Sequence, residues 1–204
     1  NNLYYETFIN NDKQWEGYRL GDIVKYWNNM KYQKESWEYS NSIPTRYPNS
    51  IGNKYLKRNN TRKTNYKLLF RIVNEEIKNQ QIPKNNISLH LRLGDVINKD
   101  YSHGYVTKFE KLENILKKFK NKEVNVFYGA HYIQKEKGMD NNLKYLEKIK
   151  DILKKYNIKY IMRNSGNPDL DFLNMCHSDI FIQSGGGFSK LIASYVKSNN
   201  KNVL

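Results

Sequence analysis

The stretch Ile87-Ser-Leu-His-Leu-Arg-Leu93 decides the fold of this chain. Its apolar residues stand at every second position, which is the period of a β-strand with one face in a core. The tight-turn pair Gly94-Asp95 follows directly. Since His90 and Arg92 share the opposite face, we expect a central strand that presents both side chains to a polar space near its carboxyl end.

Beyond this strand, short apolar runs alternate with helical periods. Further strands are expected at Val124–Tyr128, Ile158–Met162, Ile180–Gln183 and from Val203, and helices at Phe109–Phe119, Leu143–Tyr156, Asp169–Cys176 and Phe188–Lys197. Strands joined through helices by short loops form right-handed crossovers and a parallel sheet. The predicted fold class is therefore α/β, a Rossmann-like doubly wound parallel sheet over residues 85–204, with ligands bound beyond the carboxyl ends of its strands.

Residues 1–84 have a different character. They are polar, aromatic and irregular, with helices expected at about Asp22–Gln33 and Thr64–Asn79. The turn-forming run Pro83-Lys-Asn-Asn86 then marks a boundary, and the regular pattern begins after it. We expect a small, mainly helical or irregular N-terminal region over residues 1–84, followed by the Rossmann-like domain.

The chain of 204 residues carries a formal charge of +15. Such a charge attracts polyanions, although an AT-rich source genome would also place many solvated lysines on helix faces. The single cysteine, Cys176, cannot form an internal disulfide and is expected to be a buried, inert thiol. No apolar run is long enough to cross a bilayer, so we expect a soluble cytoplasmic protein that could associate with a membrane surface. The missing initiator methionine suggests a segment of a longer protein.

The first candidate site is the pair His90 and Arg92. Arginine has a planar fork of donors that grips a pyrophosphate, and a neighbouring histidine can bind a ribose, a base or a phosphate. The alternative is an internal ion pair of Arg92 with Asp95 that ties the strand to the following loop. A polar pair on a central strand favours the ligand site.

The second candidate is the loop Ser184-Gly-Gly-Gly-Phe-Ser189, between the fourth strand and the last helix. Glycines let the backbone approach a ligand, and the free N–H groups at a helix start bind anions. Ser184 and Ser189 could add hydroxyls to a diphosphate. The loop lacks the pattern of a Walker sequence, and a plain turn is the alternative.

The third candidate is Asn167-Pro-Asp169-Leu-Asp171. This pattern is typical of a helix start. It has an N-cap residue, a proline in the first turn and carboxylates near the positive end of the helix dipole. Recognition of a nucleobase or ribose by Asp169 is the second interpretation, and a metal site is the weakest. His131 follows the second expected strand and is a further donor-binding candidate. No His, Cys and Asp spacing is typical of a zinc site, and no metal is expected.

Together these motifs resemble those of the fucosyltransferase superfamily that uses GDP-fucose, which includes α1,2-, α1,6- and protein O-fucosyltransferases. Its first motif is His-x-Arg, then Arg or another residue, then Gly or Thr, then Asp, and it is matched by His90, Arg92, Gly94 and Asp95. Its later motif, Asp-Leu-x-Leu-Met-Ser-x-Cys and then Ser-Ser-Phe-Ser, resembles Asp169–Cys176 and then Gly186–Ser189. Leu93 stands where a second arginine is often found, and Gly186-Gly187 replaces the serine pair.

The resemblance implies a role for each matched residue. His90 and Asp169 would contact the guanosine, Arg92 the β-phosphate, and Ser184, Gly186, Gly187, Phe188 and Ser189 the diphosphate. Inverting transfer also needs a base for the acceptor hydroxyl. Asp100 corresponds to a carboxylate proposed for this role in the α1,6 members; Asp95 and His131 are alternatives, and a solvated loop position is the structural interpretation of Asp100.

The resemblance implies an inverting, metal-independent glycosyltransferase of the GT-B class. Residues 85–204 would be its nucleotide-sugar-binding (donor) domain, and residues 1–84 a small region on the acceptor side. The expected substrates are GDP-L-fucose and a glycan hydroxyl, and no cofactor is expected besides the donor. The same scaffold with rhamnose or mannose as the donor sugar is one alternative. A non-catalytic basic module for nucleic acid or acidic glycan is another, although nucleic acid is not the expected partner.

Overall fold

The computed structural model of the chain describes residues 66–94, 96–97, 104–129, 136–164 and 168–204. The described residues between 83 and 164 and from 174 to 204 form one compact unit. Those from 66 to 82 and from 168 to 173 belong to a second unit. The second unit contains helix α5, Tyr66–Asn79, near the expected range Thr64–Asn79. The other expected N-terminal helix, Asp22–Gln33, lies outside the described residues.

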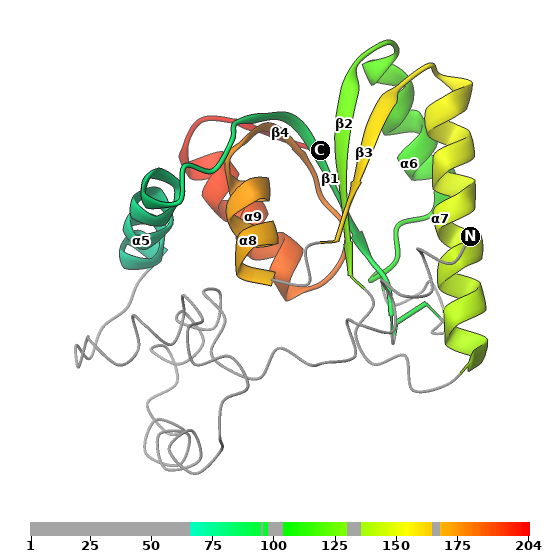
Figure 1. Cartoon of the computed structure of the whole chain (residues 1–204), viewed down its shortest axis with the longest axis horizontal. Coiled ribbons are helices and arrows are strands. Elements are labelled where there is room, and N and C mark those ends of the chain that lie inside the picture. Colours follow the sequence, from blue (N-terminus) through cyan, green and yellow to red (C-terminus); the bar gives the residue numbers. More distant parts are fainter. Residues whose placement is uncertain (1–65, 95, 98–103, 130–135, 165–167) are drawn as a thin grey trace. The chain divides into compact units, whose positions relative to one another are not determined.

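The first unit is built on a five-stranded parallel sheet with the order β3-β2-β1-β4-β5 (Figure 1). The strands are β1 Asn85–Arg92, β2 Glu123–Gly129, β3 Lys159–Arg163, β4 Ser178–Ile182 and β5 Asn202–Val203. Each strand overlaps the range that the sequence predicted. The predicted fold class, a doubly wound parallel α/β sheet, is confirmed.

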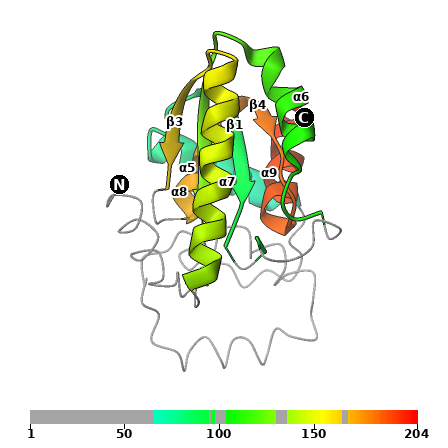
Figure 2. The same ribbon diagram turned by 90° about the vertical axis from the view of Figure 1, so that its right-hand side faces the viewer.

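Helices connect the successive strands of this sheet. They are α6 Phe109–Leu116, extended by the 3-10 helix Lys117–Phe119, then α7 Glu136–Lys155, α8 Pro168–Cys176 and α9 Gly187–Ser198. Helices α6 and α7 cover one face, and α9 lies on the other (Figures 1 and 2). Most of α8, through Leu173, belongs to the second unit.

The core under α6 and α7 follows from the alternation that predicted β1. Leu89 and Leu91 are buried on that face, beside Val126 of β2 and Ile149 of α7. Removing such a side chain from water contributes roughly 1.5–3 kcal/mol before the cost of ordering it. The opposite face of β1 carries Ser88, His90 and Arg92, so the polar positions and the core positions lie on opposite sides of one strand.

The order of the strands creates a topological switch point between β1 and β4. The chain winds from β1 outward through β2 to β3, then crosses back to β4 on the other side of β1. Ile87 pairs with Ile180 and Leu89 with Ile182 across this boundary. Sheets of this class bind ligands beyond the carboxyl ends of their strands at such a switch point, so a ligand site is expected where β1 and β4 end.

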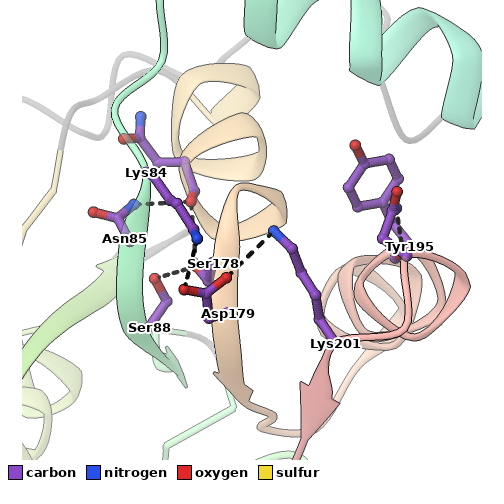
Figure 3. A network of polar contacts seen from close by, with 9 residues as sticks. Lys84, Asn85, Ser88, Ser178, Asp179, Tyr195 and Lys201 are labelled. Carbon is purple, nitrogen blue, oxygen red and sulfur yellow. Dashed lines mark hydrogen bonds and ion pairs between the residues drawn. The ribbon is translucent and has the colours of Figure 1, made fainter.

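The amino ends of β1 and β4 are joined by a polar network (Figure 3). The Ser178 hydroxyl donates to the Ser88 hydroxyl at 2.6 Å inside the protein. Asp179 pairs with Lys84 at 3.0 Å and lies 3.9 Å from Lys201. Exposed ion pairs of this kind contribute about 0–1 kcal/mol each, so the buried serine contact defines the register more strongly. The polar start of β4 is thus satisfied by residues distant in sequence.

Cys176, in the last turn of α8, is fully buried, as the sequence predicted. Burial raises the pKa of its thiol well above the usual value, because a thiolate there would lose its hydration. We expect the folded protein to be inert toward a disulfide reagent such as Ellman's reagent, and to react fully in urea. Rapid stoichiometric release of the chromophore from the native protein would contradict this burial.

Candidate functional site

The loop after β4 and the central strand β1 meet at His90. This side chain is only 7% exposed. Its Nδ1 lies 2.8 Å from the hydroxyl of Ser184, and its ring lies 5.5 Å from the ring of Phe188 at an interplanar angle of 57°. The contact arises because β1 and β4 are neighbours in the sheet. His90 therefore holds the first residue of the glycine loop on one side and the start of α9 on the other.

The two serines of the glycine loop face each other. The backbone N–H of Ser184 donates to the hydroxyl of Ser189 at 3.0 Å, and both residues are buried. With the Ser184 hydroxyl at His90 and the Ser189 hydroxyl at Ser184, these side chains give the loop its shape. The predicted contacts of both hydroxyls with a diphosphate stay predictions.

Helix α9 begins within this loop. Gly186 precedes it with φ +91°, in the region that favours glycine, and no side chain of the described residues caps the helix there. The amide of Lys190 closes the first turn by donating to the carbonyl of Gly186 at 3.2 Å. The first N–H groups of an α-helix generally have no acceptor within the helix, and the helix dipole adds partial positive charge at this end. Such an arrangement suits a phosphate.

Gly185 packs backbone against backbone on Gly104 and Tyr105. Its N–H donates to the Tyr105 carbonyl at 3.2 Å. A Cβ at Gly185 would overlap the Gly104 carbonyl oxygen and the Tyr105 Cα, and would lie 2.6 Å from the Tyr105 oxygen. No side chain fits in that space, so the position requires glycine. The loop and the 104–105 segment are therefore locked together.

Arg92 is the last residue of β1, half-buried and on the same face as His90. Across the sheet it pairs with Gly129 of β2, which has no side chain to occupy the adjacent space. The turn after it is held by Asn142 of α7, whose Oδ1 accepts the N–H of Gly94 at 2.9 Å. Gly94 has φ +83°, so glycine suits this turn as well.

Asn142 is the residue at this turn that the sequence interpretation missed. It is fully buried on α7, and it continues the apolar stripe toward the start of the helix, one turn before Leu146. A polar residue on an apolar stripe was the signal that could have found it. It satisfies a buried amide beside the site, so it is a positioning residue.

Asn142→Ala is expected to destabilise the fold by about 1–3 kcal/mol, because the buried amide of Gly94 would lose its acceptor. Asn142→Leu keeps the volume of the side chain and should lose stability comparably. Urea denaturation measures both variants against Lys144→Ala, which changes an exposed residue of the same helix. A stable Asn142→Leu protein would show that the amide contact is dispensable.

A second cation stands at the same edge of the sheet. Arg163, the last residue of β3, donates from Nε to Oδ1 of Asn125 at 2.6 Å, and its guanidinium carbon lies 5.9 Å from the centroid of the Phe127 ring. The register aligns His90 with Phe127 and Phe127 with Arg163, which puts these residues on one face. The sequence interpretation did not select Arg163, although its place at the end of a strand was visible.

The structure does not test several of the predicted site residues. Asp95, Asp100 and His131 lie outside the described residues. Asp169 is buried in the first turn of α8, which begins at Pro168 as the helix-start pattern predicted, but this part of α8 belongs to the second unit. Within the described ranges, no group of three His, Cys, Asp or Glu residues could hold a metal ion.

The exposed side of α6 forms an open hollow of about 620 Å³. It is lined by Lys108, Glu110, Lys111, Asn114, Ile115, Lys117 and Lys118. Four lysines around one hollow form a basic surface, which we call the α6 lysine surface. None of its residues belongs to the glycine loop.

Among the helices that the structure describes, none is long and apolar enough to cross a membrane.

No protein-family model matches the chain, and no curated protein matches it. Among solved structures, it is similar to POFUT1 in the apo form, with a TM-score of 0.38 and 15% identity over 67% of this chain and 49% of that chain. It is also similar to POFUT1 in complex with GDP-fucose, with a TM-score of 0.35 and 13% identity over 63% and 45% of the two chains. The chain thus spans about half the length of the solved chains it matches. At these values, function has to be argued from the residues of the chain itself.

Proposed function

We propose that this protein is a glycosyltransferase that binds the diphosphate of a GDP-sugar, GDP-L-fucose, at the carboxyl ends of β1 and β4. The observation that carries the proposal is the glycine loop at the switch point, fixed between buried His90 and the first turn of α9. Arg92 ends the central strand on the same face. Guanosine as the nucleoside and fucose as the sugar are proposed because these motifs resemble those of the fucosyltransferase superfamily.

The chemistry of sugar transfer suits this arrangement. When the bond between the anomeric carbon and the β-phosphate oxygen breaks, negative charge grows on the diphosphate. The backbone N–H groups at the start of α9 and the Arg92 guanidinium would stabilise that charge, since both are positioned before the reaction. Donors aimed at the leaving group lower the barrier more than they tighten substrate binding.

The acceptor side of the reaction needs a base. In an inverting displacement, the acceptor hydroxyl attacks the anomeric carbon from the face opposite the diphosphate and gives its proton to the base. We assign this role to Asp100, with Asp95 and His131 as alternatives. The new glycosidic bond forms as the donor bond breaks, and GDP leaves as the product.

A ligand panel tests the proposal on the full chain. GDP at millimolar concentration should raise the unfolding temperature more than UDP or ADP does, since a ligand at a hundred times its Kd adds about 2.7 kcal/mol of stability. GDP-fucose and GDP-mannose, incubated with candidate glycans, then identify the donor by release of GDP. The proposal would be overturned if GDP did not stabilise the protein. An equal rise in unfolding temperature with UDP would show that the site does not recognise guanosine.

A second candidate function is favoured by the α6 lysine surface. The cluster of Lys108, Lys111, Lys117 and Lys118 would attract a polyanion, such as single-stranded nucleic acid or an acidic glycan. Binding of this type weakens steeply as salt rises, because counterions are released. Salt-sensitive binding of single-stranded DNA that is lost in Lys111→Glu, in a protein inert to GDP, would establish this function instead.

A further inference from the structure

An exposed aromatic ring borders the glycine loop. Among the described residues, the large apolar side chains that remain exposed are Tyr105, Ile161 and Leu204, at 43%, 42% and 40%. Tyr105 is the one whose backbone bonds to the glycine loop. A Cβ placed on Gly186 would lie 3.8 Å from Cδ1 of the Tyr105 ring, so the ring stands directly beside the residue that precedes α9.

The exposure of Tyr105 does not come from a loosely attached segment. Its own carbonyl accepts the N–H of Gly185 at 3.2 Å. Val106 is buried in the core, and the carbonyl of Thr107 accepts the hydroxyl of Tyr145 at 2.7 Å. The backbone is thus anchored on the loop side and on the α7 side, while Tyr105 between these anchors remains 43% exposed. A tyrosine ring at this place offers an apolar face and a polar hydroxyl to a ligand bound at the loop.

The position of the ring selects the part of the ligand that it would meet. A diphosphate at the start of α9 would lie next to Gly186 and Gly187. The sugar is bonded directly to the phosphate, whereas the nucleobase is separated from the other phosphate by a pentose. A ring adjacent to the anion site is therefore within reach of the sugar, whose C–H face is apolar enough to pack on an aromatic surface.

We propose that Tyr105 stacks on the transferred sugar of the donor and makes the site prefer the nucleoside diphosphate sugar to the nucleoside diphosphate left after transfer. This inference rests on the proposed function, because it assumes that a diphosphate occupies the glycine loop. Tyr105 is then a residue that determines specificity, and it contributes little to binding of the product.

Titration calorimetry of the full chain with GDP and with GDP-fucose tests this role. Tyr105→Ala should weaken the affinity for GDP-fucose about tenfold, the loss expected when one aromatic face is removed from an apolar contact. The affinity for GDP should change less than about twofold. Tyr105→Phe keeps the ring and should bind both ligands as the unmodified protein does. Because the ring is exposed and the loop contacts the backbone of residue 105, both variants should keep the unfolding temperature.

The outcomes separate this inference from the function on which it rests. An unmodified protein that binds neither GDP nor GDP-fucose would overturn the proposed function. If it binds them, equal weakening of both ligands by Tyr105→Ala would place the ring on the ribose or base and overturn the inference alone. Unchanged affinity for GDP-fucose in Tyr105→Ala would overturn it as well.

Discussion

Gly185→Ala is expected to destabilise the fold by about 2–3 kcal/mol and to abolish GDP binding, because no methyl group fits at this position. The added Cβ would overlap the backbone of Gly104 and Tyr105, which cannot rotate away as a side chain could. The loop would have to move off the 104–105 segment and lose the hydrogen bond to the Tyr105 carbonyl. Urea denaturation and calorimetry with GDP measure the two effects.

Gly187→Ala is the matched control, two residues along the same loop. A Cβ there has no described atom within 4 Å, and alanine is the better helix former. Its stability should stay within about 0.5 kcal/mol of the unmodified protein. If Gly187→Ala remains stable but binds GDP more weakly, the phosphate approaches the backbone at that point. A Gly185→Ala protein as stable as Gly187→Ala would show that the loop packs differently.

Arg92→Ala should lower kcat/KM for GDP-fucose by about a hundredfold to a thousandfold, the range found when one donor to a developing charge is removed. Arg92 is half-buried at the end of the central strand, where its fork of donors can stay oriented throughout the reaction. Arg92→Lys keeps the charge but loses the planar fork of donors, so its kcat/KM should lie between those of Arg92→Ala and the unmodified protein. Steady-state release of GDP, together with GDP affinity, measures the loss.

The alternative role for Arg92 is an internal ion pair with Asp95. In that case Arg92→Ala would destabilise the fold, and the folded fraction would keep its affinity for GDP. The transfer role is therefore supported only if the unfolding temperature is retained while turnover falls. If kcat/KM of Arg92→Ala stays within threefold of the value for the unmodified protein, Arg92 has no role in the transfer reaction.

The elements of the sheet were predictable where local patterns and tertiary contacts agree. The alternation of Leu89, Leu91 and Leu93 marked β1 because its core face is continuous. Strand β4 begins at Ser178, before the predicted Ile180, because its polar first residues are paired with Ser88 and Lys84 across the sheet. Pairs between residues so distant in sequence leave no trace in a local pattern.

The candidate site was predictable in outline. The sequence placed His90 and the glycine loop at one edge of a parallel sheet, and the structure brings them into contact. The orientation of the Ser184 and Ser189 hydroxyls, the acceptor role of Asn142 and the exposure of Tyr105 depend on neighbours from other elements, so single-residue reasoning could not find them. The roles of Asp95, Asp100 and His131 stay predictions.

The imidazole of His90 also makes the site observable by spectroscopy. Its ring lies between the Ser184 hydroxyl and the tilted ring of Phe188, so small displacements of the loop change both its hydrogen bond and its magnetic environment. The chain contains 4 histidines in all, which keeps the imidazole region of a proton NMR spectrum sparse. The imidazole protons of His90, beside the glycine loop, are therefore expected to shift when a ligand binds there, so binding can be followed without an attached label.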